Sequence, residues 1–186
     1  MTGQFSGLNG PFDIILADPP WRFTSNSAAK PGRNARGHYD CLKLDEIAAL
    51  PVRDIAAPAS MLLLWTTVPF AELAFQVVNA WGYKYKSQIA WDKQRKGTGF
   101  WARNEHELLY ICTRGGFPCP KPAPFNYSLI RGQLREHSRK PDQIYSDVEA
   151  AFPGTRKLEM FSRQTREGWS VFGNESTKFD DDKAII

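Results

Sequence analysis

The residues best suited to chemistry are Asp18-Pro19-Pro20-Trp21, which directly follow the apolar run at residues 12–17. A short apolar run predicts a buried strand, and ligands of open α/β sheets bind at the carboxyl ends of strands. The two prolines fix φ and lack N–H groups, so the backbone leaves the sheet stiffly. This strand end would present a carboxylate, a carbonyl and an indole face, which suit a planar group with an exocyclic amine. The alternative is a capping turn with Trp21 in the core.

A second set of polar side chains lies near the ends of two strands predicted towards the C-terminus. Glu159 falls inside the strand at residues 157–161, Arg163 follows it, and Asn174 follows the strand at residues 169–172. An acid at the end of a parallel strand can bind the two hydroxyls of a ribose. The alternative is an ion pair between Glu159 and Arg163, because a lone acid in a strand needs a partner.

Two predicted loops are basic, and each follows a strand that ends near these groups. Residues 26–40 are rich in Gly and Ser, and residues 92–104 also carry the aromatic side chains Phe100 and Trp101. Aromatic side chains beside basic ones are typical of nucleic-acid binding, although a solvated surface is the alternative. The candidate phosphate contacts are Lys30, Arg33, Arg36, Lys93, Arg95, Lys96 and Arg103.

The remaining sequence predicts the elements that position these groups. Apolar runs bounded by turns predict further strands, and helical spacing predicts three helices. The further strands are predicted at residues 61–65, 86–91 and 108–112. The first helix is predicted at residues 44–55, with an interruption at Pro51. The second begins at Pro69 and is stopped by Gly82, and the third covers residues 141–152. Residues 114–126 are rich in Pro and Gly and are predicted to be irregular. About seven strands alternating with helices indicate an α/β domain with a largely parallel sheet.

Composition limits the classes of protein. The chain has 186 residues, of which 42% are hydrophobic, and this fits one domain over residues 1–186 with a loose lead-in (1–10) and tail (179–186). A net charge of +4 permits a polyanionic partner. The three cysteines and three histidines form no zinc pattern, so no metal is expected, and the odd cysteine count favours a reducing compartment. We find no signal peptide, membrane span, dinucleotide fingerprint or phosphate-binding loop, and expect a cytoplasmic protein.

Taken in chain order, several segments resemble the MT-A-seventy family of N6-adenine methyltransferases. The first is the Asp-Pro-Pro-Trp segment itself, and the next is Ala90-Trp91-Asp92-Lys93. Residues 135–145 resemble the family pattern R-x-x-S-x-K-P-D-x-x-Y, and residues 153–163 resemble P-G-x-R-x-x-E-[LM]-F-x-R. Trp169 with Gly173-Asn174 completes a similarity that extends from about residue 12 to residue 175.

The resemblance implies a Rossmann-like methyltransferase fold with helices on both faces, in which the catalytic motif precedes the cofactor segment. It implies S-adenosylmethionine as the cofactor and a mechanism without a metal. By position, the catalytic residues are Asp18, Pro19, Pro20 and Trp21. The base pocket, shared with Trp21, is Tyr39, Trp91 and Lys93. Cofactor contacts fall on Asp18, Lys140, Glu159, Phe161, Arg163 and Asn174, with Lys140 at the cofactor carboxylate and Glu159 and Arg163 at the ribose.

These expectations favour methyl transfer to the N6 amine of adenine in DNA. The alternatives are the same reaction on RNA and a non-catalytic nucleic-acid-binding subunit of the same fold. The intact motif at Asp18 together with Glu159 argues against the second alternative. Compared with the family, the sequence is short before residue 10, where relatives flank the cofactor adenine, and it lacks accessory RNA-binding modules. We therefore expect a compact bacterial or phage enzyme; the oligomeric state is not predicted.

Overall fold

The computed structural model describes residues 3–21, 42–97, 99, 101–133, 135, 139–174, 176–178 and 180. The described strands are β1 (Phe12–Ala17), β2 (Ala56–Thr67), β3 (Lys84–Asp92), β4 (His106–Arg114), β5 (Leu129–Arg131), β6 (Lys157–Met160) and β7 (Trp169–Phe172). The described α-helices are α1 (Leu44–Ala48), α2 (Val52–Ile55), α3 (Ala71–Ala80) and α4 (Gln143–Ala151). Within these residues, no helix has the length and apolar character needed to cross a membrane.

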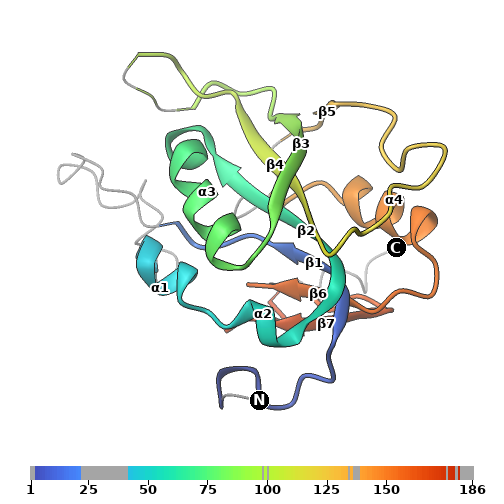
Figure 1. The fold of residues 1–186 in the computed structure, drawn as a ribbon. Helices are drawn as coiled ribbons and strands as arrows, with labels where there is room; N and C mark the ends of the chain where they lie inside the picture. Colours follow the sequence, from blue (N-terminus) through green and yellow to red (C-terminus); the bar gives the residue numbers. More distant parts are fainter. Residues whose placement is uncertain are drawn as a thin grey trace.

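The strands form one seven-stranded sheet in the order β5-β3-β4-β2-β1-β6-β7. β1 pairs in parallel with both β2 and β6, and β6 pairs in parallel with β7. β4 is antiparallel to its neighbours β2 and β3, whereas β5 is parallel to β3. Six of these strands therefore run in one direction, and the expectation of a largely parallel sheet is confirmed. Figure 1 shows β1 and β6 side by side, although more than a hundred residues separate them.

The strand order reverses beside β1, because the chain first builds the sheet outward through β2 and later returns to the other side of β1 with β6. Ligands of open α/β sheets bind at such a switch point, outside the carboxyl ends of the strands. The carboxyl ends of β1 and β6 meet there, with Ala17 in register with Met160. The antiparallel β4 brings its amino-terminal end to the same edge, with Glu107 opposite Thr67 of β2.

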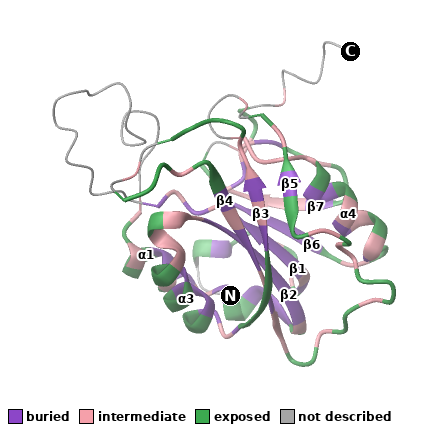
Figure 2. Cartoon of the chain, turned by 90° about the horizontal axis from the view of Figure 1, so that it is seen from above, coloured by how far each residue is buried: buried purple, intermediate pink, exposed green. Residues whose placement is uncertain are grey.

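The two faces of the sheet carry separate cores, and helices cover both. Along β1, Ile15 and Ala17 belong to the core under α1, α2 and α3. Their neighbours Ile14 and Leu16 belong to the opposite core under α4. This alternation follows from the two-residue period of a strand, and Figure 2 shows the buried sheet between the helical layers. Each fully buried Leu or Ile contributes about 1.5–3 kcal/mol, so the two cores dominate the stability of the sheet.

The elements differ from the sequence expectation in a few places. The sequence does not predict β5, because three residues after an irregular segment carry no periodic signal, and only pairing with β3 makes them a strand. β2 is much longer than the predicted residues 61–65. The predicted break at Pro51 is confirmed, since α1 ends before it and α2 begins after it. The strand predicted at residues 157–161 ends one residue early, because Phe161 has a φ of 63°.

Candidate active site

The segment after β1 is held rigidly against the rest of the sheet. The backbone N–H of Trp21 donates to the carbonyl of Pro19 at 2.8 Å, and Leu42 donates its N–H to the carbonyl of Pro20 at 3.1 Å. The indole Nε1 of Trp21 donates to the carbonyl of Trp65 at the end of β2, at 3.1 Å. These bonds fix the direction in which the chain leaves β1 and hold the short segment that carries Asp18.

Trp21 is a core side chain in this structure. It is 5% exposed, belongs to the core under α1–α3, and its ring stacks on Phe70 with centroids 5.6 Å apart. The burial matches the alternative in which Trp21 supports the turn from within the core. Its contact with a substrate base stays a prediction. The Pro19 carbonyl accepts the Trp21 N–H, and a carbonyl oxygen has two lone pairs, so it can still accept one further donor.

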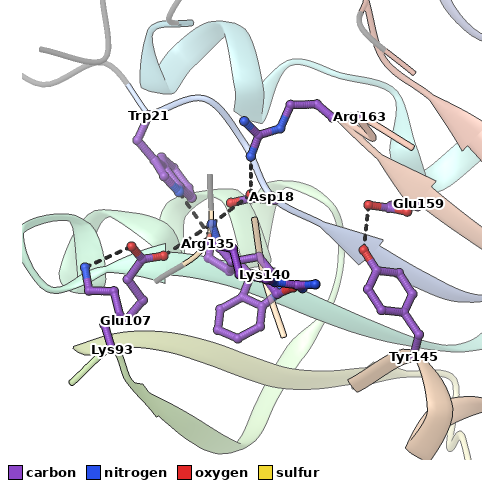
Figure 3. Close-up of polar contacts among 10 residues, drawn as sticks. Asp18, Trp21, Lys93, Glu107, Arg135, Lys140, Tyr145, Glu159 and Arg163 are labelled. Atoms are coloured by element: carbon purple, nitrogen blue, oxygen red, sulfur yellow. Dashed lines mark hydrogen bonds and ion pairs between the residues drawn. The ribbon is translucent and has the colours of Figure 1, made fainter. Parts of the chain in front are cut away.

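A line of alternating charges connects Asp18 to Glu107 in β4 and to Lys93, the residue after β3. The Nζ of Lys140 lies 2.8 Å from Asp18 Oδ2 and 3.3 Å from Glu107 Oε2, and Glu107 Oε1 lies 3.1 Å from the Nζ of Lys93 (Figure 3). Burial alone would raise the pKa of Glu107, but the charges of Lys140 and Lys93 outweigh it and lower that pKa. Burial likewise disfavours a charged Lys140, but Asp18 and Glu107 raise its pKa. Three ion pairs therefore link the four side chains in one continuous chain.

Lys140 reaches this position because the chain before α4 is tied down locally. The guanidinium of Arg135 lies 2.7 Å from Asp142 Oδ2 and also donates to the backbone carbonyl of Lys140. Asp142 is the N-cap residue of α4, so the three residues form a closed turn at the helix start. The spacing of Arg, Lys and Asp in the segment 135–145 thus has a structural reason, since it aims the lysine at Asp18.

Glu159 is a buried acid with one unused oxygen. It is 8% exposed, and its Oε1 accepts a hydrogen bond of 2.8 Å from the hydroxyl of Tyr145 in α4 (Figure 3). Its Oε2 is buried and has no hydrogen-bond partner within the described part of the chain. Burial raises the pKa of Glu159 to about 7. A buried acceptor without a donor costs roughly 1–3 kcal/mol, and a ligand hydroxyl would remove that cost.

The turn after β6 is strained and tightly packed. Phe161 adopts a φ of 63°, which non-glycine residues rarely use. Ser162 then donates its N–H to the carbonyl of Phe172 at 3.2 Å. A Cβ on Gly173 would lie 2.6 Å from the Ser162 carbonyl oxygen, so only glycine allows this approach. Strained backbone of this kind clusters at ligand sites. The turn also sends Arg163 back over β1, with its Nη2 3.9 Å from Asp18 Oδ2.

These groups surround one pocket at the switch point of the sheet. Its lining residues are Leu16, Asp18, Trp65, Arg139, Lys140, Tyr145, Glu159, Phe161, Arg163 and Gln164. Five of the six predicted cofactor residues are therefore brought together. The sixth, Asn174, is exposed and does not line this pocket. The described residues contain no cluster of three or more His, Cys, Asp or Glu side chains that could hold a metal ion.

The predicted base-pocket and phosphate-contact residues are more scattered. Trp91 is 1% exposed, and its Nε1 donates to the carbonyl of Gly132 at 2.9 Å, so the structure places it in the core beside β5. Lys93 is engaged with Glu107. The side chains of Arg95, Lys96 and Arg103 are exposed on the loop between β3 and β4. Four predicted residues lie outside the described residues, namely Tyr39, Lys30, Arg33 and Arg36.

Several residues of the site are not among the sequence candidates: the lining residues Leu16, Trp65, Arg139 and Gln164, and the polar contacts Glu107, Tyr145 and Arg135. Glu107 lies one residue before the strand predicted at 108–112, although it carries the same signal as Glu159, a lone acid beside an apolar run. Tyr145 and Arg135 belong to the segment 135–145 that resembles the family, and their side chains face Glu159 and Lys140 respectively. The spacing within that segment is the available signal for both.

Comparison with known proteins agrees with this geometry. The MT-A70 family model matches residues 12–175. The Type II methyltransferase M.MunI of Mycoplasma sp is 28% identical over 180 residues, covering 88% of this chain and 77% of that protein. The N(6)-adenosine-methyltransferase catalytic subunit METTL3 of Homo sapiens is 31% identical over 180 residues, covering 89% of this chain and 28% of that protein. A putative N(6)-adenosine-methyltransferase MT-A70-like protein of Medicago truncatula is 32% identical over 176 residues, covering 89% and 26% respectively.

The chain therefore spans about a quarter of the length of the two eukaryotic relatives and most of the length of M.MunI. The family match extends over nearly the whole sheet, from the first residue of β1 to beyond β7. It includes the segment at Asp18 and every described residue that lines the pocket. The chain belongs to the MT-A70 family of S-adenosylmethionine-dependent methyltransferases.

Proposed function

We propose that this protein transfers a methyl group from S-adenosylmethionine to the N6 amine of adenine in DNA. The observation that carries the proposal is the placement of Asp18. Its carboxylate stands at the carboxyl end of β1, is held by Lys140 at 2.8 Å, and lines the pocket that contains Glu159. One sheet carries both cores, which supports a single methyltransferase domain over residues 1–186.

The pocket residues fit the cofactor. The unpartnered Oε2 of Glu159 is a buried acceptor that a ribose hydroxyl would satisfy. Lys140 lines the same pocket with a cationic Nζ, which suits the carboxylate of the cofactor. Arg163 contributes a second positive charge beside Asp18. When bound, S-adenosylmethionine supplies an electrophilic methyl group on a sulfonium.

Asp18 and Pro19 would prepare the substrate amine. The lone pair of an adenine amine is delocalised into the ring, which makes the nitrogen a weak nucleophile. Two acceptors on its N–H hydrogens return electron density to the nitrogen and aim it at the methyl group. Asp18 offers a carboxylate oxygen, and Pro19 offers the second lone pair of its carbonyl. Because these acceptors are fixed before the substrate arrives, the rate gain comes from positioning and electrostatics.

The electrostatics of the surface support a nucleic-acid substrate. The net charge is +4, and three exposed cations, Arg95, Lys96 and Arg103, lie on the loop between β3 and β4. That loop begins at Lys93, whose Nζ contacts Glu107 and through it the Lys140–Asp18 pair. Phosphates bound along the loop would therefore lie at the same edge of the sheet as the pocket.

The relatives support two substrates. The choice of DNA rests on the likeness to M.MunI, which is named a Type II methyltransferase and of whose length the chain spans 77%. The names of the eukaryotic relatives contain N(6)-adenosine-methyltransferase, which makes adenosine in RNA the second candidate. Both candidates use the same amine and the same residues of this chain.

Methyl-labelled cofactor and matched DNA and RNA strands of the same base order separate the candidates. Each substrate is incubated in single- and double-stranded form, digested to nucleosides and measured by mass spectrometry. Labelled N6-methyldeoxyadenosine is the expected product. Labelled N6-methyladenosine from the RNA strands alone would reassign the substrate to RNA. Tight binding of both nucleic acids without any labelled product, from a protein that binds cofactor, would favour a non-catalytic subunit.

A further inference from the structure

Trp101 stands out among the described side chains because its indole is entirely in solvent. It is 103% exposed, whereas the other exposed large hydrophobic residues range from 36% to 43%. It lies on the loop at residues 93–105, which connects β3 to β4 at the carboxyl edge of the parallel strands (Figure 1). An indole has a large apolar surface, and tryptophan is enriched where a partner covers it. None of the ring contacts in the described part of the chain involves this side chain.

Contacts across the loop hold the described residues on either side of Trp101 together. Gly97 donates its N–H to the carbonyl of Asn104 at 3.1 Å across the loop. A Cβ on Gly97 would lie 2.6 Å from that carbonyl oxygen, and a Cβ on Gly99 would lie 1.9 Å from the carbonyl oxygen of Ala102. Only glycine permits such close approach of the two sides of the loop. Both close approaches join residues on either side of Trp101 in the sequence, so Trp101 lies in the part of the loop that the two glycines close.

The charge around Trp101 selects the kind of partner. The exposed side chains of Arg95, Lys96 and Arg103 lie on the same loop, and Glu105 is the one acid among residues 93–105. At its base, the loop is joined through Lys93 and Glu107 to the site. A flat aromatic face beside several cations is the arrangement that proteins use to stack on bases while contacting phosphates.

We propose that Trp101 stacks on an unpaired base of the nucleic acid whose adenine enters the pocket at Asp18. The inference rests on the proposed function, because it takes the polyanion at this loop to be the methylation substrate. Base faces inside a duplex are covered by their neighbours, so an indole can reach one only where a base has lost a neighbour. A duplex adenine must leave the stack before its amine can react, which exposes the faces of adjacent bases.

Binding of fluorescein-labelled strands, measured by anisotropy, tests the stacking contact. The probes are a single DNA strand of about twelve nucleotides and a strand of the same length made of abasic residues. Trp101→Ala should bind the base-bearing strand roughly tenfold more weakly than wild type, and Trp101→Phe should retain most of the affinity. On the abasic strand, wild type and Trp101→Ala should bind equally. Stacking involves no counterion, so Trp101→Ala should keep the wild-type dependence of affinity on salt.

Arg103→Ala is the matched control on the same loop. If Arg103 contacts a phosphate, this variant should lower the slope of log affinity against log salt by about 0.7 on both strands. Equal affinity of Trp101→Ala and wild type for the base-bearing strand would overturn the proposal. A weakening of the same size on the abasic strand would overturn it too, because Trp101 would then contact the backbone.

Two further measurements distinguish the stacking contact from an interface between copies of the protein and from a failure of the proposed function. Sedimentation of Trp101→Ala should match that of wild type, and a shift from dimer to monomer with unchanged DNA affinity would assign Trp101 to an interface between copies and overturn the proposal. In methylation assays, Trp101→Ala should raise KM for DNA and leave kcat near the wild-type value. If wild type gave no methylated product while Trp101→Ala still bound only the base-bearing strand more weakly, the proposed function would fail and the stacking contact would stand.

Discussion

Replacing Glu159 by Gln should change both the stability of the free protein and its affinity for the cofactor. Glu159 is 8% exposed, its Oε2 has no partner among the described residues, and burial raises its pKa to about 7 from an ordinary value of 4.5. The hydrogen bond from Tyr145 and the charge of Arg163 act in the opposite direction, and Asp18 reinforces the rise. The net effect is a carboxyl group that binds its proton more tightly in the folded protein than in the unfolded chain.

The sign of the stability change follows from that difference. The contribution of Glu159 to stability is fully present below about pH 4.5 and is lost as the pH rises towards 7. Each tenfold change in proton affinity corresponds to about 1.4 kcal/mol, so the whole loss is roughly 3 kcal/mol. Glu159→Gln cannot ionise and avoids this loss. The difference in free energy of unfolding between Glu159→Gln and wild type should therefore grow, in favour of Glu159→Gln, by about 2–3 kcal/mol as the pH rises from 5 to 8.

Urea unfolding of both proteins at several pH values between 5 and 8 measures the difference directly. Other titrating groups act on both proteins, so the difference between their free energies of unfolding isolates Glu159. Glu72→Gln, on an exposed position of α3, is the matched control for removing one negative charge from the protein. Parallel curves for wild type and Glu159→Gln across this range would refute the account of a buried acid with an unused oxygen.

The negative charge of Glu159, which destabilises the free protein, should favour binding of the cofactor. Hydroxyl groups that donate to the carboxylate favour its ionised form, so binding should release a proton, and affinity should rise as the pH passes 7. Hydrogen bonds to a charged group contribute roughly 1.5–3 kcal/mol each, so Glu159→Gln should bind S-adenosylmethionine at least about tenfold more weakly at pH 8. Calorimetry in buffers of different ionisation enthalpy reports both quantities. Equal affinity of the two folded proteins at pH 8 would refute the assignment.

Three further changes test the surrounding interactions. Glu107→Gln removes the carboxylate between two lysines and should cost about 3 kcal/mol of stability in urea unfolding; a cost below about 1 kcal/mol would contradict its bridging role. Tyr145→Phe removes a donor that lowers the pKa of Glu159, so the pH midpoint of cofactor affinity should move upward, and an unmoved midpoint would contradict this. Arg95→Ala with Lys96→Ala should lower the salt slope of nucleic-acid affinity by about 0.7–0.9 for each phosphate that these cations neutralise, and an unchanged slope would place both in solvent.

Local rules predict the parts of the fold and site that depend on nearby residues. The strand before Asp18 follows from a run of apolar residues, and the break at Pro51 follows from its missing N–H. The family resemblance and the largely parallel sheet are confirmed. β5 could not be predicted, because its three residues become a strand only by pairing with β3.

Interactions between distant residues account for most of what the sequence does not predict. Lys140 meets Asp18 across 122 residues, and no spacing rule indicates that Glu107 would join the same ion-pair chain. The indoles illustrate a second difficulty. The family resemblance assigns Trp21 and Trp91 to a base pocket; both are buried here, their contact with a base stays a prediction, and tryptophan serves cores and ligand sites alike. Exposure separates the two uses only after the fold is known.

Single-turnover methylation by Asp18→Asn tests the central claim most directly. The substitution keeps the size of the side chain, removes the charge held by Lys140, and replaces one acceptor oxygen by a donor. Asp13→Asn is the matched control, since Asp13 lies at the opposite end of β1 and accepts from the backbone N–H of Arg156 at 2.8 Å. All three proteins are first compared for folding by thermal unfolding.

At saturating cofactor and nucleic acid, wild type and Asp13→Asn should form labelled N6-methyladenine at the same rate, measured by mass spectrometry of the digested product. Asp18→Asn should be at least about 100-fold slower, by comparison with the removal of other hydrogen bonds formed in a transition state. It should still bind nucleic acid, because the loop between β3 and β4 is unchanged. A folded Asp18→Asn protein that methylates adenine as fast as wild type would contradict the proposed role of Asp18.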